Sequence, residues 1–136
     1  MQLLPLVDTP GLYIGHDAQN EWLYVDWRGE ASPAAARASG LLLLRTLRAW
    51  PCSKLLNDNS GACGFTAHLT SRGGRWLEQL QAAGLRHVAW VLPRHLPARQ
   101  AVQELVHTIE RPSVGTFDDV VSAYAWLQQQ PLAWLV

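Results

Sequence analysis

A polar stretch near the middle of the sequence carries the residue types best suited to binding. It reads Asn57-Asp58-Asn59-Ser60-Gly61-Ala62-Cys63-Gly64, between a short apolar run and an amphipathic segment. If the run is a strand and the segment a helix, the stretch leaves the carboxyl end of a strand, where open α/β sheets bind ligands and partners. It also enters a helix N-terminus, whose free N–H groups favour anions. The same residue types are typical of any turn before a helix, so a purely structural role remains open.

Two other turns are expected at the same edge of the sheet. Arg28-Gly29-Glu30 follows one predicted strand, and Pro93-Arg94-His95 follows another. Because the carboxyl ends of parallel strands meet at one edge, these turns would join the polar stretch in a single rim. The residues predicted to form this binding or regulatory rim are Asn57, Asp58, Asn59, Ser60, Gly61, Arg28, Arg94 and His95.

Groups that could carry out catalysis are isolated in the sequence. Cys63 precedes a predicted helix, whose dipole favours a thiolate, but no histidine is placed beside it by the sequence. Asp58 has no acidic companion for general acid–base chemistry. We therefore assign no catalytic residue and predict that the protein is not an enzyme. An enzyme that uses Asp58, Ser60 or Cys63 together with His68 or His95 is kept as an alternative.

Metal and nucleotide sites lack their usual sequence signatures. The histidines are scattered, and neither H-x-x-x-H nor C-x-x-C occurs. The dinucleotide-binding, Walker and hydrolase-elbow motifs are also absent. We therefore expect no metal and no cofactor.

Length and charge limit the kinds of protein and of binding partner that remain. The 136 residues suit a single domain, which we place at 1–136 with an ordered core at about 10–130 and an apolar tail at 131–136. Eleven basic and eleven acidic residues cancel, whereas nucleic-acid binders carry a basic excess. No apolar run approaches a membrane span, and the N-terminus has no signal-peptide pattern. We expect a cytoplasmic protein that binds no nucleic acid.

The hydrophobic spacing predicts one α/β domain with a mixed, mostly parallel sheet of about five strands and about four helices, in the order β-β-α-β-α-β-α-β-α. Residues 12–16 and 21–27 are expected to form an antiparallel hairpin. A helix should begin at Ser32-Pro33 and end near Trp50. Later strands are predicted at 54–57, 87–92 and 113–117, and later helices at about 66–83, 97–110 and from 120 onward, the last capped by Asp118 or Asp119.

Four segments, taken in this order, point to a known fold. They are Leu23-Tyr24-Val25-Asp26-Trp27-Arg28-Gly29 followed by a helix, Leu55-Leu56-Asn57-Asp58-Asn59-Ser60-Gly61, Ala83-Gly84-Leu85-Arg86-His87-Val88-Ala89-Trp90-Val91, and Phe117-Asp118-Asp119 leading into Ala125-Trp126-Leu127. The pattern covers roughly residues 10–130 and resembles the STAS domains, the fold of sulphate transporters and anti-sigma-factor antagonists. It is most similar to small bacterial SpoIIAA-like proteins of uncharacterised role.

This resemblance implies a regulatory or protein-interaction module with a protein partner. Signalling members carry an Asp-Ser-Ser-Gly-like turn whose serine is phosphorylated by a partner kinase, and the added charge disrupts docking. Ser60 is the matching position and the predicted phosphoacceptor. The turn departs from the family pattern at Asn59, which replaces the first serine, and at Ala62, where leucine is usual.

A small-molecule or lipid carrier is the second interpretation, based on the seven tryptophans. Trp22, Trp76 and Trp90 fall in periodic segments and are expected to pack in the core, whereas Trp134 in the tail could contact a partner. The apolar tail and the outer strand of the hairpin, which has no predicted neighbour, also favour a homodimer.

Overall fold

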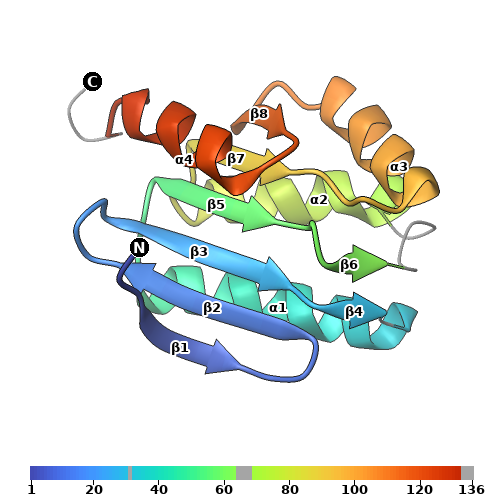
Figure 1. Ribbon diagram of the computed structural model, residues 1–136, viewed down its shortest axis with the longest axis horizontal. Coiled ribbons are helices and arrows are strands. Elements are labelled where there is room, and N and C mark those ends of the chain that lie inside the picture. The colour runs from blue at the N-terminus through green and yellow to red at the C-terminus, as the bar shows by residue number, and fades with distance from the viewer. Residues whose placement is uncertain (31, 64–68, 133–136) are drawn as a thin grey trace.

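A computed structural model describes residues 1–30, 32–63 and 69–132, and for residues 30, 63 and 69–74 only the backbone. Its main element is one six-stranded sheet in the order β1-β2-β3-β5-β7-β8. The strands are β1 (Leu4–Asp8), β2 (Leu12–Asp17), β3 (Trp22–Trp27), β5 (Lys54–Asp58), β7 (His87–Val91) and β8 (Ser113–Phe117). A separate pair, β4 (Gly29–Glu30) and β6 (Ala62–Cys63), extends from one edge (Figure 1).

The mixed, mostly parallel α/β architecture agrees with the sequence prediction. β2 and β3 form the expected antiparallel hairpin, and β3, β5, β7 and β8 run parallel to one another. The predicted number of strands was too low, because β1, β4 and β6 were not anticipated. Since β1 pairs with β2 along the outside, β2 is not an edge strand, contrary to the prediction.

The proline in β1 explains why this strand was overlooked. Pro5 cannot donate a backbone hydrogen bond, so strands that contain proline are confined to sheet edges or bulges. β1 has both properties: it is the first strand of the sheet, and its register against β2 shifts between Pro5 and Val7.

Two of the four helices in the described residues begin at capping residues that the sequence predicted. α1 (Pro33–Ala49) is capped by Ser32, whose hydroxyl oxygen accepts from the Ala35 N–H at 3.1 Å. α4 (Val120–Gln129) is capped by Asp119. α2 (Leu69–Ala82) and α3 (Leu96–His107) are the other two. None of the helices in the described residues is long and apolar enough to cross a membrane.

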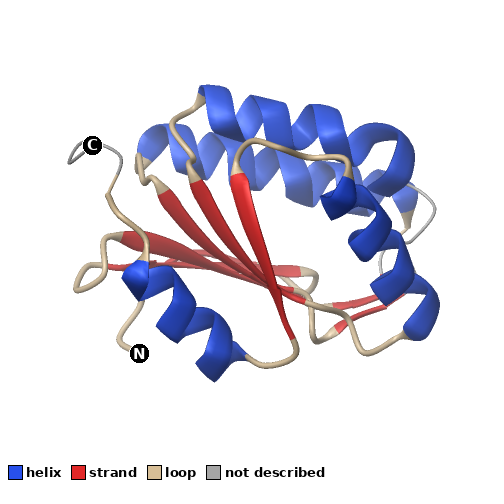
Figure 2. Ribbon diagram, turned by 90° about the horizontal axis from the view of Figure 1, so that it is seen from above, coloured by secondary structure: helices blue, strands red, loops and turns tan. Residues whose placement is uncertain are grey.

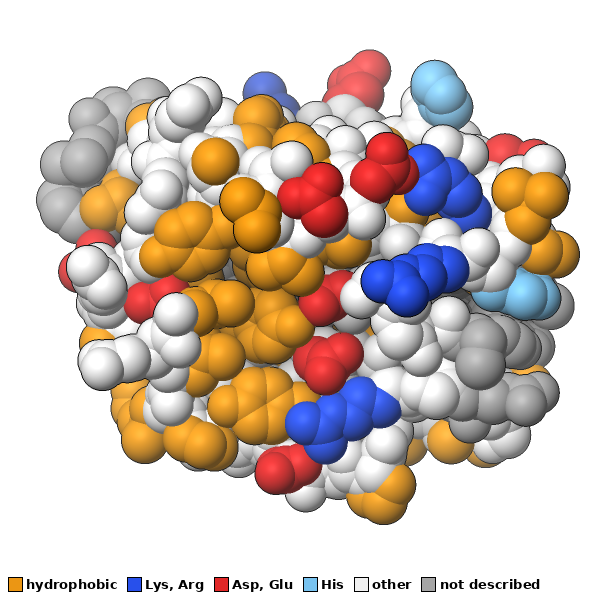
Figure 3. All heavy atoms as spheres, in the orientation of Figure 1, with side chains coloured by type: hydrophobic (Ala, Val, Ile, Leu, Met, Phe, Trp, Pro, Cys, Tyr) orange, Lys and Arg blue, Asp and Glu red, His pale blue; other side chains and the backbone are white. Residues whose placement is uncertain are grey.

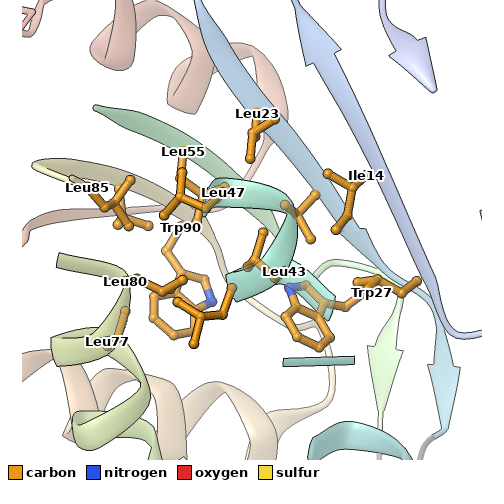
Figure 4. Close-up of a cluster of buried hydrophobic side chains, with 14 of the residues drawn as sticks. Ile14, Leu23, Trp27, Leu43, Leu47, Leu55, Leu77, Leu80, Leu85 and Trp90 are labelled. Atoms are coloured by element: carbon orange, nitrogen blue, oxygen red, sulfur yellow. The ribbon is translucent and has the colours of Figure 1, made fainter. Parts of the chain in front are cut away.

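The larger core lies between the sheet and α1, α2 and α3, as Figure 2 shows from above and Figure 4 in close-up. Leu43 and Leu47 of α1 meet Leu55 of β5 in this core. α1 and α2 approach closely at Gly40, whose carbonyl accepts from Trp76 Nε1 at 3.0 Å. A Cβ atom at Gly40 would lie only 3.3 Å from that nitrogen, so the contact favours glycine.

The opposite side of the sheet is covered only in part. α4 packs on β5, β7 and β8, where Leu127 and Ala123 join Leu56, Ala89 and Trp22 in a second, smaller core. Figure 1 shows α4 in front of these strands, whereas no helix passes in front of β1, β2 and β3. Trp22 and Trp90 are buried and Trp76 is half-buried, as predicted, while Trp134 lies outside the described residues.

Candidate functional site

The polar stretch at the end of β5 is more buried than the sequence suggested. Asn57 and Asp58 belong to the strand, and Asn57, Asp58 and Asn59 are only 1%, 5% and 1% exposed. The prediction of an exposed rim from Asn57 to Gly64 was therefore wrong for its first three residues. Ser60 is half-buried and Gly61 is exposed, so the accessible part of the turn begins at Ser60.

Asn57 is buried because a neighbouring strand satisfies it. It lies beside Val25 in the parallel β3–β5 pair, and its Oδ1 accepts from Trp27 Nε1 at 2.6 Å. Both side chains face the larger core, where an unpaired amide oxygen would be costly. Asn57 therefore has a structural role, and its side chain is not available to a ligand.

Asp58 lies on the other face and gathers three hydrogen bonds. Its Oδ2 accepts from the Tyr24 hydroxyl at 2.7 Å, and its Oδ1 accepts from Ser60 Oγ at 2.6 Å and from the Ser60 N–H at 3.0 Å. Burial and the hydrogen bond to Asp58 raise the pKa of Tyr24 far above its ordinary value, so its hydroxyl is a permanent donor. One carboxylate thus connects Ser60 in the turn to Tyr24 on the sheet.

The backbone of the turn is tied to the segment that follows β3. The Gly29 N–H donates to the Gly61 carbonyl at 3.0 Å, and Gly29 is the β4 residue that faces Ala62 of β6. Farther back, the Asn59 N–H donates to the Val91 carbonyl at 3.0 Å. These contacts hold the Ser60 turn between the ends of β3 and β7.

A charged cluster borders the turn on the same face. Asp26 is the register partner of Asp58, and Arg28 Nε lies 3.4 Å from Asp26 Oδ2. Arg28 also contacts Asp8 Oδ1 at 2.8 Å, and its guanidinium lies 5.2 Å from the centroid of the Tyr13 ring. Burial and the nearby carboxylate of Asp58 raise the pKa of Asp26, while Arg28 opposes the shift. Arg28 is therefore shared by two carboxylates, those of Asp8 and Asp26, and Asp26 lies next to Asp58.

Beside this cluster, the half of the sheet that α4 does not cover forms a surface we call the open face. It consists of Leu3, Tyr13, Gly15, Tyr24 and Asp26, all of them partly exposed except Gly15. A Cβ atom at Gly15 would lie 2.9 Å from Leu3 Cβ and 3.0 Å from the Tyr13 hydroxyl, so these side chains lie flat on the strand. Figure 3 shows apolar side chains gathered over β1–β3, bordered by acidic and basic ones.

The remaining predicted rim residues lie at the same edge without joining the turn. Arg94 and His95 follow β7 and are exposed. Among the described residues, Ser60 Oγ is bonded to Asp58, and no histidine is hydrogen-bonded to it. His68 and the side chain of Cys63 lie outside the described part, so the enzyme alternative that uses them is not addressed by the structure.

Sequence reasoning missed Tyr24, Asp26 and Trp27 as members of the site. The strict alternation in 22–27 does separate Tyr24 and Asp26 from Trp27, as the structure confirms. What was lacking was the register of β3 against β5, which places Asp26 next to Asp58. Within residues 1–30, 32–63 and 69–132, no three metal-binding side chains lie together.

Comparisons with known proteins give one structural match. The sequence matches no family model, and no curated protein matches it. The structure is similar to that of an uncharacterized protein of the DUF3478 family from Shewanella loihica PV-4, described as having a SpoIIAA-like fold, with a TM-score of 0.55 and 16% sequence identity. The match covers 90% of this chain and 98% of that one. The protein therefore has a SpoIIAA-like fold, as the segments of its sequence predicted.

Proposed function

We propose that this chain is a protein-interaction module without enzymatic activity, which docks a partner on the open face and is switched by phosphorylation of Ser60. The observation that carries the proposal is the carboxylate of Asp58, which holds both the Ser60 hydroxyl and the Tyr24 hydroxyl. The fold resemblance supports the choice of Ser60, since it is the position that matches the phosphoacceptor of signalling STAS proteins.

The electrostatics of the turn give phosphorylation a defined effect. Ser60 Oγ now donates to Asp58, and a phosphoryl group would replace this donor with a dianion beside Asp58 and Asp26. The negative charges of the phosphoryl group and of these neighbouring carboxylates would repel one another strongly in a partly buried site. The turn would have to move away from Asp58, and the hydrogen bond from Tyr24 on the open face would be disturbed with it.

The open face indicates the chemistry of the partner. Its apolar part is supplied by Leu3, Tyr13 and Tyr24, and its border carries Asp8, Asp26 and Arg28. Exposed apolar surface with a charged border is typical of protein interaction sites. With more carboxylates than cations at the border, the complementary partner presents an apolar segment that carries a lysine or arginine.

The test compares the proteins retained from a lysate by immobilised variants, quantified by mass spectrometry. The open-face variant replaces Leu3 and Tyr13 by serine, S60D imitates the phosphorylated state, and S60A removes only the hydroxyl. V121S is the matched control, because Val121 is 79% exposed but lies on α4. Circular dichroism checks that each variant is folded.

We expect specific proteins that wild type, S60A and V121S retain and that the open-face variant and S60D lose. Mass spectrometry of the natively expressed protein should also find phosphate on Ser60. If all five forms retain the same proteins in the same amounts, the open face is not the docking surface. If the open-face variant loses these proteins but S60D retains them as wild type does, Ser60 is not the switch.

A further inference from the structure

The last strand of the sheet, β8, has a free edge. β8 pairs only with β7 and lies at the opposite side of the sheet from β1 (Figure 1). The Ser113 N–H donates to the carbonyl just before β7 at 2.9 Å, and the Phe117 carbonyl accepts from the N–H just after β7 at 2.9 Å. Because backbone groups alternate along a strand, the N–H and C=O groups of Val114 and Thr116 point away from β7. Among the described residues, these outward groups have no hydrogen-bond partner.

The two edges of the sheet differ in their protection against other chains. Edge strands are commonly blunted by proline, by charged side chains or by a bulge, because a free edge can pair with a strand of another molecule. β1 has Pro5 and an irregular register against β2. β8, which reads Ser-Val-Gly-Thr-Phe, contains neither proline nor a charged residue, and its register against β7 is continuous. β8 is therefore the edge to which a further strand can add.

The position of the free groups in β8 suits pairing with a second copy of the same strand. An antiparallel pair related by a two-fold axis at Gly115 would place Val114 of each copy opposite Thr116 of the other. These are the residues with outward backbone groups, so each of the two pairs would exchange both of its hydrogen bonds. The β-branched side chains of Val114 and Thr116 would then lie next to each other, which is a favourable cross-strand combination.

The residues around this axis leave apolar surface for a second copy to cover. Gly115 lies next to Ala89 and faces the α4 side of the sheet. A Cβ atom at Gly115 would lie 2.9 Å from Phe117 Cε2 and 3.1 Å from Trp126 Cε2, so these two rings cover the glycine. Their centroids are 5.5 Å apart, and both side chains are only half-buried. The two-fold axis would bring the aromatic pairs of both copies together and bury their exposed parts.

Charges at the two ends of β8 favour the antiparallel arrangement. Arg111, two residues before the strand, is exposed and forms no ion pair within the described part of the chain. Asp118 and Asp119 directly follow the strand and are also exposed, although Asp118 pairs with Arg99 of its own chain. In an antiparallel pair the start of one strand lies beside the end of the other, so each Arg111 would approach the acidic end of its partner. Parallel pairing would bring like charges together instead.

We propose that two copies of this chain form a dimer by antiparallel pairing of their β8 edges, which joins the two sheets into one. The sequence favoured a homodimer through the outer strand of the hairpin, but that strand is covered by β1. The β8 edge lies across the sheet from the open face on β1–β3, so the dimer goes beyond the function proposed above. Each dimer would present two open faces.

The experiment measures the oligomeric state by sedimentation velocity between micromolar and millimolar concentration, with circular dichroism as the check of folding. T116P removes an outward N–H that the pairing with β7 does not use, and edge strands tolerate such a proline. T116A keeps this N–H and is its matched control. R111E places carboxylates at both ends of the interface, and R111E/D118K restores opposite charges. R45E is the control for charge, since Arg45 is an exposed cation on α1.

We expect a concentration-dependent dimer for wild type, T116A and R45E. T116P and R111E should each weaken the dimer at least about tenfold, and R111E/D118K should recover most of the loss. Hydrogen exchange followed by NMR should show that the Val114 amide is protected in the wild-type dimer and exchanges rapidly in T116P. The Gly115 amide, which faces β7, should be protected in both.

A wild-type chain that stays monomeric over the whole concentration range would overturn the proposal. A dimer that T116P and R111E leave unchanged would also overturn it, because the interface would then lie elsewhere. If T116P does not fold, R111E and its charge swap decide the matter alone. None of these measurements depends on Ser60 or on proteins retained from a lysate, so failure of the dimer and failure of the proposed function are distinguishable.

Discussion

Tyr24 and Asp58 lie on neighbouring parallel strands, and the phenol hydroxyl of Tyr24 donates a 2.7 Å hydrogen bond to Asp58 Oδ2. The other oxygen of the same carboxylate accepts from Ser60. The Asp58 carboxylate therefore connects Tyr24 on the open face to the Ser60 turn. Through this connection a change at Ser60 can influence the open face.

Removing the donor of this pair should cost stability. Y24F leaves Asp58 without one of its three hydrogen bonds, and we expect the free energy of unfolding to fall by about 1–2 kcal/mol, because the bond is charge-assisted but partly exposed. Urea denaturation measures the change. Y13F is the matched control, since no hydrogen bond of the Tyr13 hydroxyl is found among the described residues. A loss as large in Y13F as in Y24F would contradict the role of the Tyr24–Asp58 bond.

The start of α4 offers a comparison between two adjacent aspartates. Asp119 Oδ1 accepts from the Ser122 N–H at 2.7 Å, while Asp118 instead pairs with Arg99 on the surface. D119A should lower the midpoint of thermal unfolding by roughly 3–5 °C through loss of the cap. D118A should change it little, because exposed ion pairs contribute little. If D118A lowers the unfolding midpoint more than D119A does in a thermal melt, Asp118 is the effective cap.

His87 should make stability depend on pH in the mildly acidic range. Burial lowers its pKa in the folded state, so the unfolded chain binds the proton more readily. The stabilising contribution is therefore complete above the unfolded pKa of about 6.5 and is lost as the pH falls towards the lower folded pKa. H87N should flatten the dependence in this window, whereas H107N, at an exposed position, should not. An unchanged slope in H87N would refute this assignment.

Cys52 should be unreactive in the folded protein. It is 8% exposed, and burial raises the pKa of its thiol to about 11, with a further contribution from Glu21. At pH 8 only about a thousandth of the thiol is ionised, and the thiolate is the reactive form. In a C63S background, iodoacetamide should modify Cys52 slowly in buffer and rapidly in urea. Similar rates in both solvents would mean that the thiol is accessible in the folded chain.

The sequence predicted most of the fold because its signals were local. Ser32-Pro33 marked the start of α1, and the helix predicted at about 66–83 is followed by Gly84, which has a φ of 116°. The strand predicted within 21–27 is β3, and because side chains alternate along a strand, Trp22 and Trp27 lie in the two cores on opposite sides of the sheet. Such features depend on residues only a few positions apart.

The candidate site was predicted less well because its contacts are long-range. The bond from Trp27 to Asn57 and the bond from Tyr24 to Asp58 each join residues about 30 positions apart. They bury Asn57 and Asp58, two residues of the polar stretch that was expected to form part of the rim. The burial of Lys54, which is only 4% exposed, was missed for the same reason, since it follows from the pairing of β5 with β3 and β7.

The most direct test of the account is an NMR comparison of S60D and S60A with wild type. If Asp58 connects the turn to the sheet, S60D should shift the amide signals of Tyr24, Tyr13 and Gly15 on the open face as well as those of the turn. S60A, which adds no charge, should leave the open-face signals close to those of wild type. Shifts in S60D that remain confined to residues 58–63 would contradict the central claim that charge at Ser60 is transmitted to the docking surface.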